Sequence, residues 1–226
     1  MSVLAHKHER MPASTHKRLL IFPCNGNGRE AVDALGDDHQ LVGFIDDTPE
    51  KQGTGPYGFP VLGRQALIDF RDACVLAVPG GPVSYLNRRA IIEGLALASG
   101  RFATVIHPSA RISRFATIGY NVLIMAGVVI TSNAVIGNHV CVLPNSVIHH
   151  DATVGDWSLI GAGVTIAGGT AIGQNCYIGS GSSIINDTRI GDRTMIGLGA
   201  NVIASAPADA RMVGNPARRI GPANGY

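Results

Sequence analysis

The sequence predicts two units in series, a small α/β unit followed by a parallel β-helix. Three observations support this fold class. Aliphatic residues recur with a period of six from Ile106 onward, glycine is frequent at 29 of 226 residues, and the first hundred residues alternate strand-like and helix-like segments. A period of six fits neither the 3.6-residue turn of a helix nor the two-residue alternation of an ordinary strand. It indicates short strands joined by tight corners.

The segments before the repeat predict an α/β domain over residues 18–104. "KRLLIF" is a short apolar strand, "PCNGNGREAVDAL" is a glycine turn leading into an amphipathic segment, and "HQLVGFIDDTPE" is a second strand that ends in acids. Further along, "RQALIDF" predicts a short helix, "ACVLAVPGG" a third strand, and "SYLNRRAIIEGLALASG" a longer helix that ends at Gly100.

The repeat itself predicts a β-helix over residues 105–204. Every sixth residue from Ile106 to Val202 is Ile or Val, seventeen positions without a break. The residue four places later is small or short, and glycine often follows the aliphatic directly. If three hexads make one triangular coil, the aliphatics fill the interior, the small residues fit beside corners, and the glycines permit backbone angles closed to other residues. Each coil then buries its face against the next.

Composition excludes several function classes. A net charge of +2 with no basic runs argues against nucleic acid and anionic membrane surfaces as partners, and no segment is long enough for membrane insertion. Four scattered cysteines without a CxxC pair indicate reduced thiols and a cytoplasmic protein. Residues 1–17 lack the apolar core of a signal peptide and are expected to be a disordered lead-in, with Met11 as an alternative start. Residues 205–226 form a C-terminal tail.

One stretch of the repeat, "VIHHDATVGD", carries the candidate catalytic residues His150 and Asp151. An imidazole that titrates near pH 6.5 is a natural proton acceptor at neutral pH. The alternative is a solvated edge, since histidine pairs at surfaces are common. Adjacent strand residues point to opposite faces, so Asp151 can polarise His150 only if the corner bends the backbone. Otherwise it contacts a substrate amine.

The glycine turn of the first unit is a candidate nucleotide site. A turn between a strand and a helix can cradle phosphate with its backbone N–H groups, although such loops are structural about as often. Acids at the end of a second strand can accept hydrogen bonds from a ribose or a base, or simply cap the next turn. The candidate residues are Asn25, Gly26, Asn27, Asp46 and Asp47.

The hexads resemble the [LIV]-[GAED]-x-x-[STAV]-x repeat of the hexapeptide-repeat acyltransferases, which implies a left-handed coil. With an α/β domain in front, "HDATVGD" within the repeat and "VGNPARRI" after it, the chain from about residue 18 looks like the nucleotide-sugar N-acetyltransferases and the related sialic acid O-acetyltransferases. The resemblance implies a Rossmann-like N-terminal domain that binds a nucleotide sugar, acetyl-CoA as co-substrate, and no metal. It further implies a homotrimer with active sites between subunits, which N-acetylates 4-amino-4,6-dideoxy sugars for bacterial surface glycans.

The resemblance also assigns roles to residues. It makes His150 the general base followed by the acid Asp151, and it makes the Gly168 backbone N–H the donor to the tetrahedral oxygen. It places acetyl-CoA on Gly168, Ser180, Arg218 and Arg219. Asn145 is the candidate to contact the sugar in place of an Asn that the family carries two residues earlier, and the alternative is a different acceptor.

The chain departs from the family pattern at several positions. Leu143 stands where members carry a sugar-contacting Asn, and Leu159 stands where some carry a second histidine. Pro23 and Asn27 replace a glycine and a histidine of the first domain's turn. These departures concern the nucleotide and the sugar more than the acetyl transfer.

Three alternatives stay open. An O-acetyltransferase acting on serine or a simple sugar would share the β-helix, but serine acetyltransferases carry a helical N-terminal domain that this chain lacks. A γ-type carbonic anhydrase would need widely spaced zinc ligands, a spacing that His139, His149 and His150 do not have. A non-catalytic scaffold would tolerate His150→Ala and would show no saturable coenzyme A binding.

Overall fold

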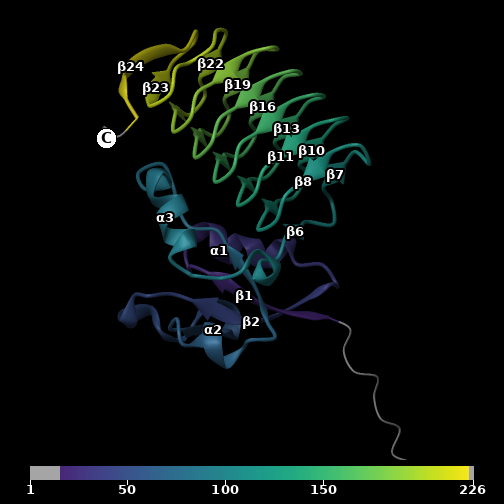
Figure 1. The fold of residues 1–226 in the computed structure, drawn as a ribbon, viewed down its shortest axis with the longest axis vertical. Coiled ribbons are helices and arrows are strands. Elements are labelled where there is room, and N and C mark those ends of the chain that lie inside the picture. The colour runs from purple at the N-terminus through teal and green to yellow at the C-terminus, as the bar shows by residue number, and fades with distance from the viewer. Residues whose placement is uncertain (1–15, 224–226) are drawn as a thin grey trace, which may run out of the picture.

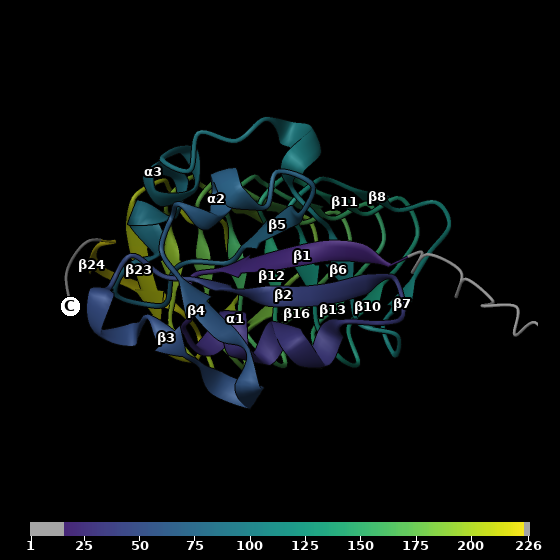
Figure 2. The same ribbon diagram turned by 90° about the horizontal axis from the view of Figure 1, so that it is seen from below.

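The computed structural model describes residues 16–223, so most of the expected lead-in, including Met11, lies outside the described part. A small α/β unit lies against one side of a stack of coils (Figure 1). Its strands β1 and β2 run along the length of the stack (Figure 2). Within residues 16–223, no helix has both the length and the apolar character needed to cross a membrane.

The N-terminal unit is built on a five-stranded sheet in the order β3-β4-β2-β1-β5. The strand β1 is parallel to β2 and β5, β2 is parallel to β4, and β3 is antiparallel to β4. Leu19, Leu20 and Ile21 of β1 are fully buried, as expected for a strand covered on both faces. The bounds are β1 Lys17–Phe22, β2 His39–Ile45, β3 Gly53–Thr54, β4 Pro60–Leu62 and β5 Cys74–Ala77.

Short helices connect these strands. The three strands and the first two helical segments expected from the sequence are confirmed, whereas β3 and β4 were not expected. The predicted long helix to Gly100 is wrong, because α3 ends at Glu93 and the chain then turns with a positive φ of 52° at Ala96. The bounds are α1 Gly26–Glu30, η1 Ala31–Ala34, η2 Pro49–Lys51, η3 Pro56–Gly58, α2 Ala66–Asp69, η4 Tyr85–Asn87, α3 Arg88–Glu93 and η5 Ser99–Arg101.

The repeat forms two-residue strands that recur every six residues. They are β6 Val105–Ile106, β7 Arg111–Ile112, β8 Thr117–Ile118, β9 Leu123–Ile124, β10 Val129–Ile130, β11 Val135–Ile136, β12 Cys141–Val142, β13 Val147–Ile148, β14 Thr153–Val154, β15 Leu159–Ile160, β16 Thr165–Ile166, β17 Ala171–Ile172, β18 Tyr177–Ile178, β19 Ser183–Ile184, β20 Arg189–Ile190, β21 Met195–Ile196 and β22 Asn201–Val202.

Every third strand pairs in parallel, which gives three sheets around a triangular coil. We name them the first sheet (β6 to β21 in steps of three, extended by β23 and β24), the second sheet (β7 to β22) and the third sheet (β8 to β20). Partners are 18 residues apart, as in Ile148 with Ile166. Residues 18 apart therefore stack at the same place on neighbouring coils, about 4.8 Å from one another. The arrangement fits a left-handed β-helix.

The interior confirms the hexad prediction except in the first coil, where Ile112 and Ile118 are half-buried and Ile106 is exposed. From Ile124 to Val202 the predicted aliphatics are all buried, and small residues such as Ala134 and Ser146 are fully buried beside them. Ile106 is 40% exposed, because no coil precedes the first one.

The reason expected for the glycines that follow the aliphatics is wrong. Gly161 and Gly173 do not adopt positive φ. A Cβ at Gly161 would lie 2.5 Å from the backbone nitrogen of Ser180, one coil further on. These glycines therefore serve the close approach of neighbouring coils, and not an unusual backbone angle.

The N-terminal unit packs on the outer surface of the first sheet. The outward residue of each of its strands from β9 to β21 is apolar, and it is buried in one cluster with β1 residues such as Leu19 and Ile21. A signal for this contact exists in the sequence, since the residue before the inward aliphatic is apolar in every third hexad. These outward residues are Leu123, Cys141, Leu159, Tyr177 and Met195.

A second contact lies at the edge between the third and first sheets. One corner residue per coil has positive φ there, and this column meets residues 77–88 of the N-terminal unit. Asn121 bonds the backbone of Ala77, and Asn175 donates to the Leu86 carbonyl at 3.0 Å. The column consists of Asn121, His139, Trp157, Asn175 and Arg193.

Arg88 joins the two units from a fully buried position. Its guanidinium donates to the carbonyl oxygens of Pro79, His139 (2.7 Å) and Trp157 (2.9 Å). Burial lowers the pKa of Arg88 to about 10. The three carbonyls take the place of a counter-ion and hold the N-terminal unit against two successive coils.

The expected C-terminal tail continues the β-helix. Ala206 forms a bridge to Ile190, β23 (Ala210–Val213) extends the first sheet, and β24 (Arg218–Pro222) folds back antiparallel to β23.

Candidate functional site

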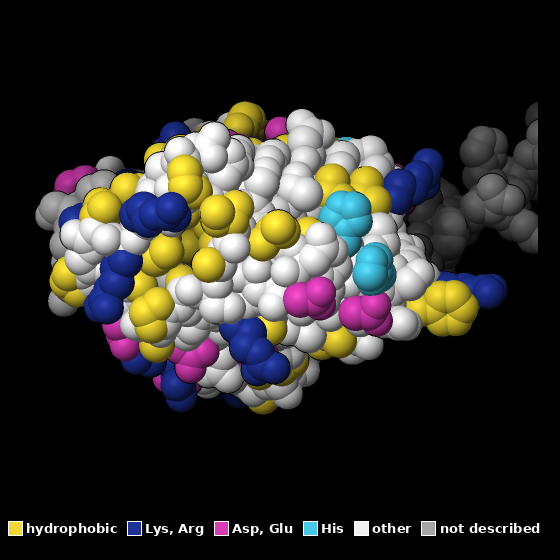
Figure 3. All heavy atoms as spheres, turned by 90° about the horizontal axis from the view of Figure 1, so that it is seen from above, with side chains coloured by type: hydrophobic (Ala, Val, Ile, Leu, Met, Phe, Trp, Pro, Cys, Tyr) yellow, Lys and Arg dark blue, Asp and Glu magenta, His cyan; other side chains and the backbone are white. Residues whose placement is uncertain are grey.

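His150 and Asp151 lie at the corner after β13, on the edge between the second and third sheets. The N-terminal unit covers the first sheet, so this edge is the one opposite to it. Figure 3 looks onto that side of the β-helix, where histidine and acidic side chains gather.

The two candidate catalytic side chains contact one another. Nδ1 of His150 lies 2.7 Å from Oδ2 of Asp151, and both side chains are more than half exposed. Asp151 has a φ of 59°, so the corner does bend the backbone and brings adjacent side chains together. A carboxylate at Nδ1 favours the tautomer with the proton on Nδ1, which leaves the Nε2 lone pair free to accept a proton.

Asp151 is held as a carboxylate. Hydrogen bonds from His150 and from Asn133, whose Nδ2 lies 3.1 Å from Oδ1, keep the pKa of Asp151 below its ordinary value of 3.8. Asp151 therefore stays charged at neutral pH, and its lowered pKa makes it a weaker base than an ordinary imidazole.

Gly168 lies against the His150 ring, one coil further on. A Cβ at Gly168 would be 2.6 Å from both Nε2 and Cε1 of His150. Its neighbour Gly169 donates its N–H to the His150 carbonyl at 3.0 Å, whereas no acceptor for the Gly168 N–H exists within residues 16–223. One proton acceptor and one unused N–H donor thus lie side by side, an arrangement suited to acyl transfer.

Two further expected site residues lie at a different edge, between the first and second sheets. Asn145 is exposed at that corner, and the Ser180 hydroxyl accepts the Ala162 N–H at 3.1 Å. Within one chain, the structure does not bring either residue to His150.

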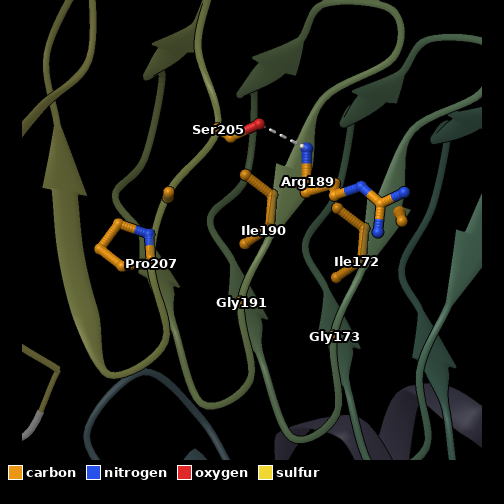
Figure 4. A pocket seen from close by; sticks show the side chains of 9 residues that line it. Ile172, Gly173, Arg189, Ile190, Gly191, Ser205 and Pro207 are labelled. Atoms are coloured by element: carbon orange, nitrogen blue, oxygen red, sulfur yellow. Dashed lines mark hydrogen bonds between the residues drawn. The ribbon is translucent and has the colours of Figure 1, made fainter.

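Arg218 and Arg219 are exposed on β24, at the C-terminal end of the first sheet. A shallow hollow of about 440 Å³ lies nearer the His150 edge, on the third sheet, and contains Arg189 (Figure 4). The Arg189 backbone N–H donates to Oγ of Ser205 at 3.0 Å. Within residues 16–223, no side-chain hydrogen bond or ion pair occupies the Arg189 guanidinium.

Sequence reasoning missed Arg189, although a signal was present. It is the one charged residue among the outward strand positions of the third sheet, where the others are Thr or aliphatic (Thr117, Val135, Thr153 and Ala171).

In the N-terminal unit the glycine turn is organised by its own side chains. Oδ1 of Asn25 accepts the Gly28 N–H at 2.8 Å, and Nδ2 of Asn27 donates to the Gly80 carbonyl at 3.2 Å. A Cβ at Gly28 would collide with the Pro23 carbonyl, whereas Gly26 faces open space. Gly28 is thus required by packing, and Gly26 is free to meet a ligand.

The two acids after β2 are already paired. The buried Asp46 carboxylate accepts from the Thr48 N–H and from Nζ of Lys51, both at 3.0 Å. Burial alone would raise the pKa of Asp46, but these hydrogen bonds outweigh it and hold that pKa below its ordinary value. Asp47 makes a bidentate ion pair with Arg64. The contacts of Asp46 are those of a turn cap.

A hollow of about 340 Å³ beside the turn presents cations that sequence reasoning missed. Arg29 and Lys51 line it together with Cys24, Thr54, Gly55, Pro56 and Val61. Arg29, beside a Lys51 that is already paired with Asp46, gives the hollow a positive charge that suits the phosphates of a nucleotide.

The third histidine considered for a zinc site lies elsewhere. His139 is buried at the edge facing the N-terminal unit, stacked on Trp157 with ring centroids 5.8 Å apart. Among the described residues, no cluster of three or more His, Cys, Asp or Glu side chains could hold a metal ion.

Comparisons with known proteins match part of the β-helix in sequence and 91% of the chain in structure. The bacterial transferase hexapeptide family (six repeats) matches residues 133–168, and the hexapeptide repeat of succinyl-transferase matches residues 152–185. No curated protein matches the chain in sequence.

Several solved structures share the fold. The acetyltransferase domain of PglB from Neisseria gonorrhoeae, in complex with acetyl coenzyme A, is 27% identical with a TM-score of 0.80, over 91% of this chain and 100% of that one. WeeI from Acinetobacter baumannii is 26% identical with a TM-score of 0.75, over the same shares. A perosamine N-acetyltransferase from Caulobacter crescentus, with CoA and GDP-perosamine, is 22% identical with a TM-score of 0.80, over 91% and 97%.

Proposed function

We propose that this chain, a hexapeptide-repeat acyltransferase of the nucleotide-sugar N-acetyltransferase family, transfers the acetyl group of acetyl-CoA to the 4-amino group of a nucleotide-linked 4-amino-4,6-dideoxy sugar. The observation that carries the proposal is the grouping of His150, Asp151 and Gly168 at one exposed edge. The similarity to a PglB domain that binds acetyl coenzyme A supports the donor.

The mechanism follows from three groups. The uncharged amine attacks the thioester carbonyl, and Nε2 of His150 removes a proton from the attacking nitrogen. The Gly168 N–H stabilises the tetrahedral oxygen. When the C–S bond breaks, the new C–N bond remains as the amide, and the proton on His150 is transferred to the departing thiolate. Asp151 keeps the imidazole in the required tautomer and stabilises the imidazolium.

We propose that the donor extends from Gly168 along the same edge toward the C-terminal coils. Coenzyme A carries phosphates at the end far from its thiol, and Arg189 is a cation in the hollow along that direction. Arg189 therefore joins Arg218 and Arg219 as a candidate phosphate ligand, whereas Ser180 has its hydroxyl engaged at another edge.

The acceptor site is proposed in the Rossmann-like N-terminal domain (18–104), at Gly26, Asn27 and the hollow with Arg29 and Lys51. In one chain this domain covers the first sheet, and His150 lies on the opposite edge. A sugar held by the N-terminal domain would therefore meet His150 of a different subunit. This supports a homotrimer with active sites between subunits.

Exposed apolar side chains support the same assembly. Ile185 is 50% exposed and Ile203 is 56% exposed, directly after β19 and β22 of the second sheet, and Leu198 is 66% exposed at its border. Hydrophobic side chains gather on the side of the β-helix seen in Figure 3. Contiguous apolar surface of this kind marks interfaces. Four free cysteines suit a reducing compartment, and we propose the cytoplasm.

The first test is thiol release from acetyl-CoA with a panel of UDP-, dTDP- and GDP-linked 4-amino sugars, wild type beside His150→Ala. Turnover with one acceptor, reduced at least about 100-fold in the variant with similar acetyl-CoA binding, supports the proposal. Turnover only with hydroxyl acceptors would indicate a sugar O-acetyltransferase. If neither protein shows saturable binding of acetyl-CoA, the chain is a scaffold and the proposed function is wrong.

A complementation test addresses the shared site. His150→Ala chains are mixed with chains carrying Arg29→Glu and Lys51→Glu, under conditions that exchange subunits. Mixed assemblies are expected to regain activity, because some sites then combine an intact N-terminal domain with an intact His150. If assemblies shown to contain both variants do not recover activity, the N-terminal domain and His150 of the same chain form the site.

A further inference from the structure

Asn133 contacts the oxygen of Asp151 that His150 does not use. Its Nδ2 donates to Oδ1 of Asp151 at 3.1 Å, while Oδ2 of the same carboxylate lies 2.7 Å from Nδ1 of His150. Asn133 is 18 residues before Asp151 and lies at the same corner of the preceding coil, with the same φ of 59°. The three side chains form a line across two coils.

Packing does not hold this pair in place. The side chains of His150 and Asp151 are 61% and 56% exposed, so neighbouring atoms leave both free to adopt other rotamers. Within residues 16–223, the side-chain hydrogen bonds of Asp151 are those with His150 and Asn133. The orientation of the carboxylate therefore depends on the amide of Asn133.

We infer that Asn133 is a positioning residue, which fixes the Asp151 carboxylate so that His150 presents Nε2 to the acceptor amine. By occupying Oδ1, the amide leaves Oδ2 directed at Nδ1 and prevents rotation of the carboxylate away from the ring. A carboxylate fixed at Nδ1 keeps the proton there and the lone pair on Nε2. This inference rests on the proposed function, because it gives the pair a reaction to serve.

The chain contains a matched pair without a histidine. Asn138 and Asp156 are also 18 residues apart, with Nδ2 of Asn138 3.4 Å from Oδ2 of Asp156, at the edge between the third and first sheets. Removing the Asn138 amide thus breaks the same kind of contact, together with the hydrogen bond that Oδ1 of Asn138 accepts from the Tyr120 N–H, at an edge that does not contain His150.

The test uses Asn133→Gly, because glycine adopts a positive φ without strain and the substitution removes only the side chain. Asn138→Ala is the control. Asn133→Gly is expected to lower kcat about 10- to 100-fold with little change in the KM for acetyl-CoA, since the base is misplaced while the donor site is intact. Asn138→Ala is expected to keep wild-type kcat.

Two readouts separate positioning from a structural role. The nitrogen shifts of a ¹⁵N-labelled His150 ring report its tautomer without substrate. In wild type the proton of the neutral ring is expected on Nδ1. In Asn133→Gly the neutral ring is expected to be a mixture of the Nδ1 and Nε2 tautomers. In Asn133→Asp a second carboxylate faces Asp151, so the acid limb of kcat/KM is expected to move to higher pH. A residue that did not orient the Asp151 carboxylate would leave the tautomer unchanged, and an added charge that did not face Asp151 would give a smaller shift of the acid limb.

The outcomes are decisive. If Asn133→Gly retains wild-type kcat and the Nδ1 tautomer, the positioning role is wrong even though the proposed function stands. If no acceptor supports turnover in wild type, the proposed function is wrong, and the tautomer measurement still decides whether Asn133 orients the pair. Equal losses in Asn133→Gly and Asn138→Ala would also overturn the inference.

Discussion

Gly168 lies so close to the imidazole of His150 that a methyl group at Gly168 would be 2.6 Å from Nε2. The two residues come from neighbouring coils and share one corner position, 18 residues apart. The absence of a side chain at Gly168 makes the space in which the ring lies, and it leaves the Gly168 N–H beside the proposed base.

We expect Gly168→Ala to lower kcat at least about 100-fold, because the added methyl displaces the ring from its position. The melting temperature should change little, since Gly168 does not require a positive φ. Steady-state thiol release and a thermal scan measure both effects. Gly100→Ala, where no atom lies within 4 Å of the new methyl, is the control and should keep full activity. An active Gly168→Ala enzyme would contradict the proposed site.

Asp151→Asn should lower kcat about 100-fold, because an amide cannot stabilise the imidazolium or enforce the tautomer as a carboxylate does. The wild-type pH profile adds a second check. The pKa of Asp151 is lowered from 3.8 by its hydrogen bonds with His150 and Asn133, so Asp151 titrates well below the range of an ordinary imidazole. The acid limb of log kcat/KM should therefore rise with a slope of one. A slope of two above pH 4 would show that Asp151 also titrates there.

His139 should make the fold sensitive to acid. Burial lowers its pKa from 6.5 to about 4. Between these values the unfolded chain binds a proton that the folded protein does not, so stability is complete above pH 6.5 and is lost as the pH falls to 4. The loss amounts to about 3 kcal/mol.

Denaturant unfolding of wild type and His139→Asn at pH 7 and pH 4 measures this effect. Asn tolerates the positive φ of this corner. Between pH 7 and pH 4 the His139→Asn variant should lose about 3 kcal/mol less stability than wild type. His149→Asn removes a histidine outside the buried cluster and should retain the wild-type dependence. Equal pH dependence in His139→Asn and wild type would rule out this origin.

Ile160→Asp should destabilise the protein by about 4 kcal/mol or more, because an unpaired carboxylate would have no partner inside the coil. Thr153→Asp, at an exposed outward position, should fold normally. Circular dichroism and urea unfolding compare the two. A soluble, cooperatively folded Ile160→Asp protein would contradict the interior assignment.

The six-residue period is sufficient to predict the interior of the β-helix from the sequence. The same period also fixes where each residue lies around the coil. Counting in steps of 18 from His150 reaches Gly168 and Ser132, and from Asp151 it reaches Asn133, whereas Asn145 and Ser180 fall at another edge. Counting along the sequence is therefore enough to tell which candidate residues can share an edge with His150.

Other features depend on contacts between distant segments. The residues after Glu93 have good helix formers, but the chain must turn at Ala96 to reach the first coil. Arg88 looks like an ordinary surface arginine in sequence, and it is buried only because two coil corners and the Pro79 carbonyl meet around it. The residues next to Arg88 in the sequence give no indication that carbonyl groups of distant segments surround its guanidinium.

The 18-residue coil also limits how the gene can change in length. Deleting one hexad between His150 and Gly168 would keep the aliphatic period intact, yet it would carry every later side chain to the next edge of the prism. Gly168 would leave the side of His150, and the later outward residues of the first sheet, Tyr177 and Met195, would no longer face the N-terminal unit. Insertions and deletions within the repeat should therefore be retained only in multiples of 18 residues, which is a constraint of 54 nucleotides on the gene.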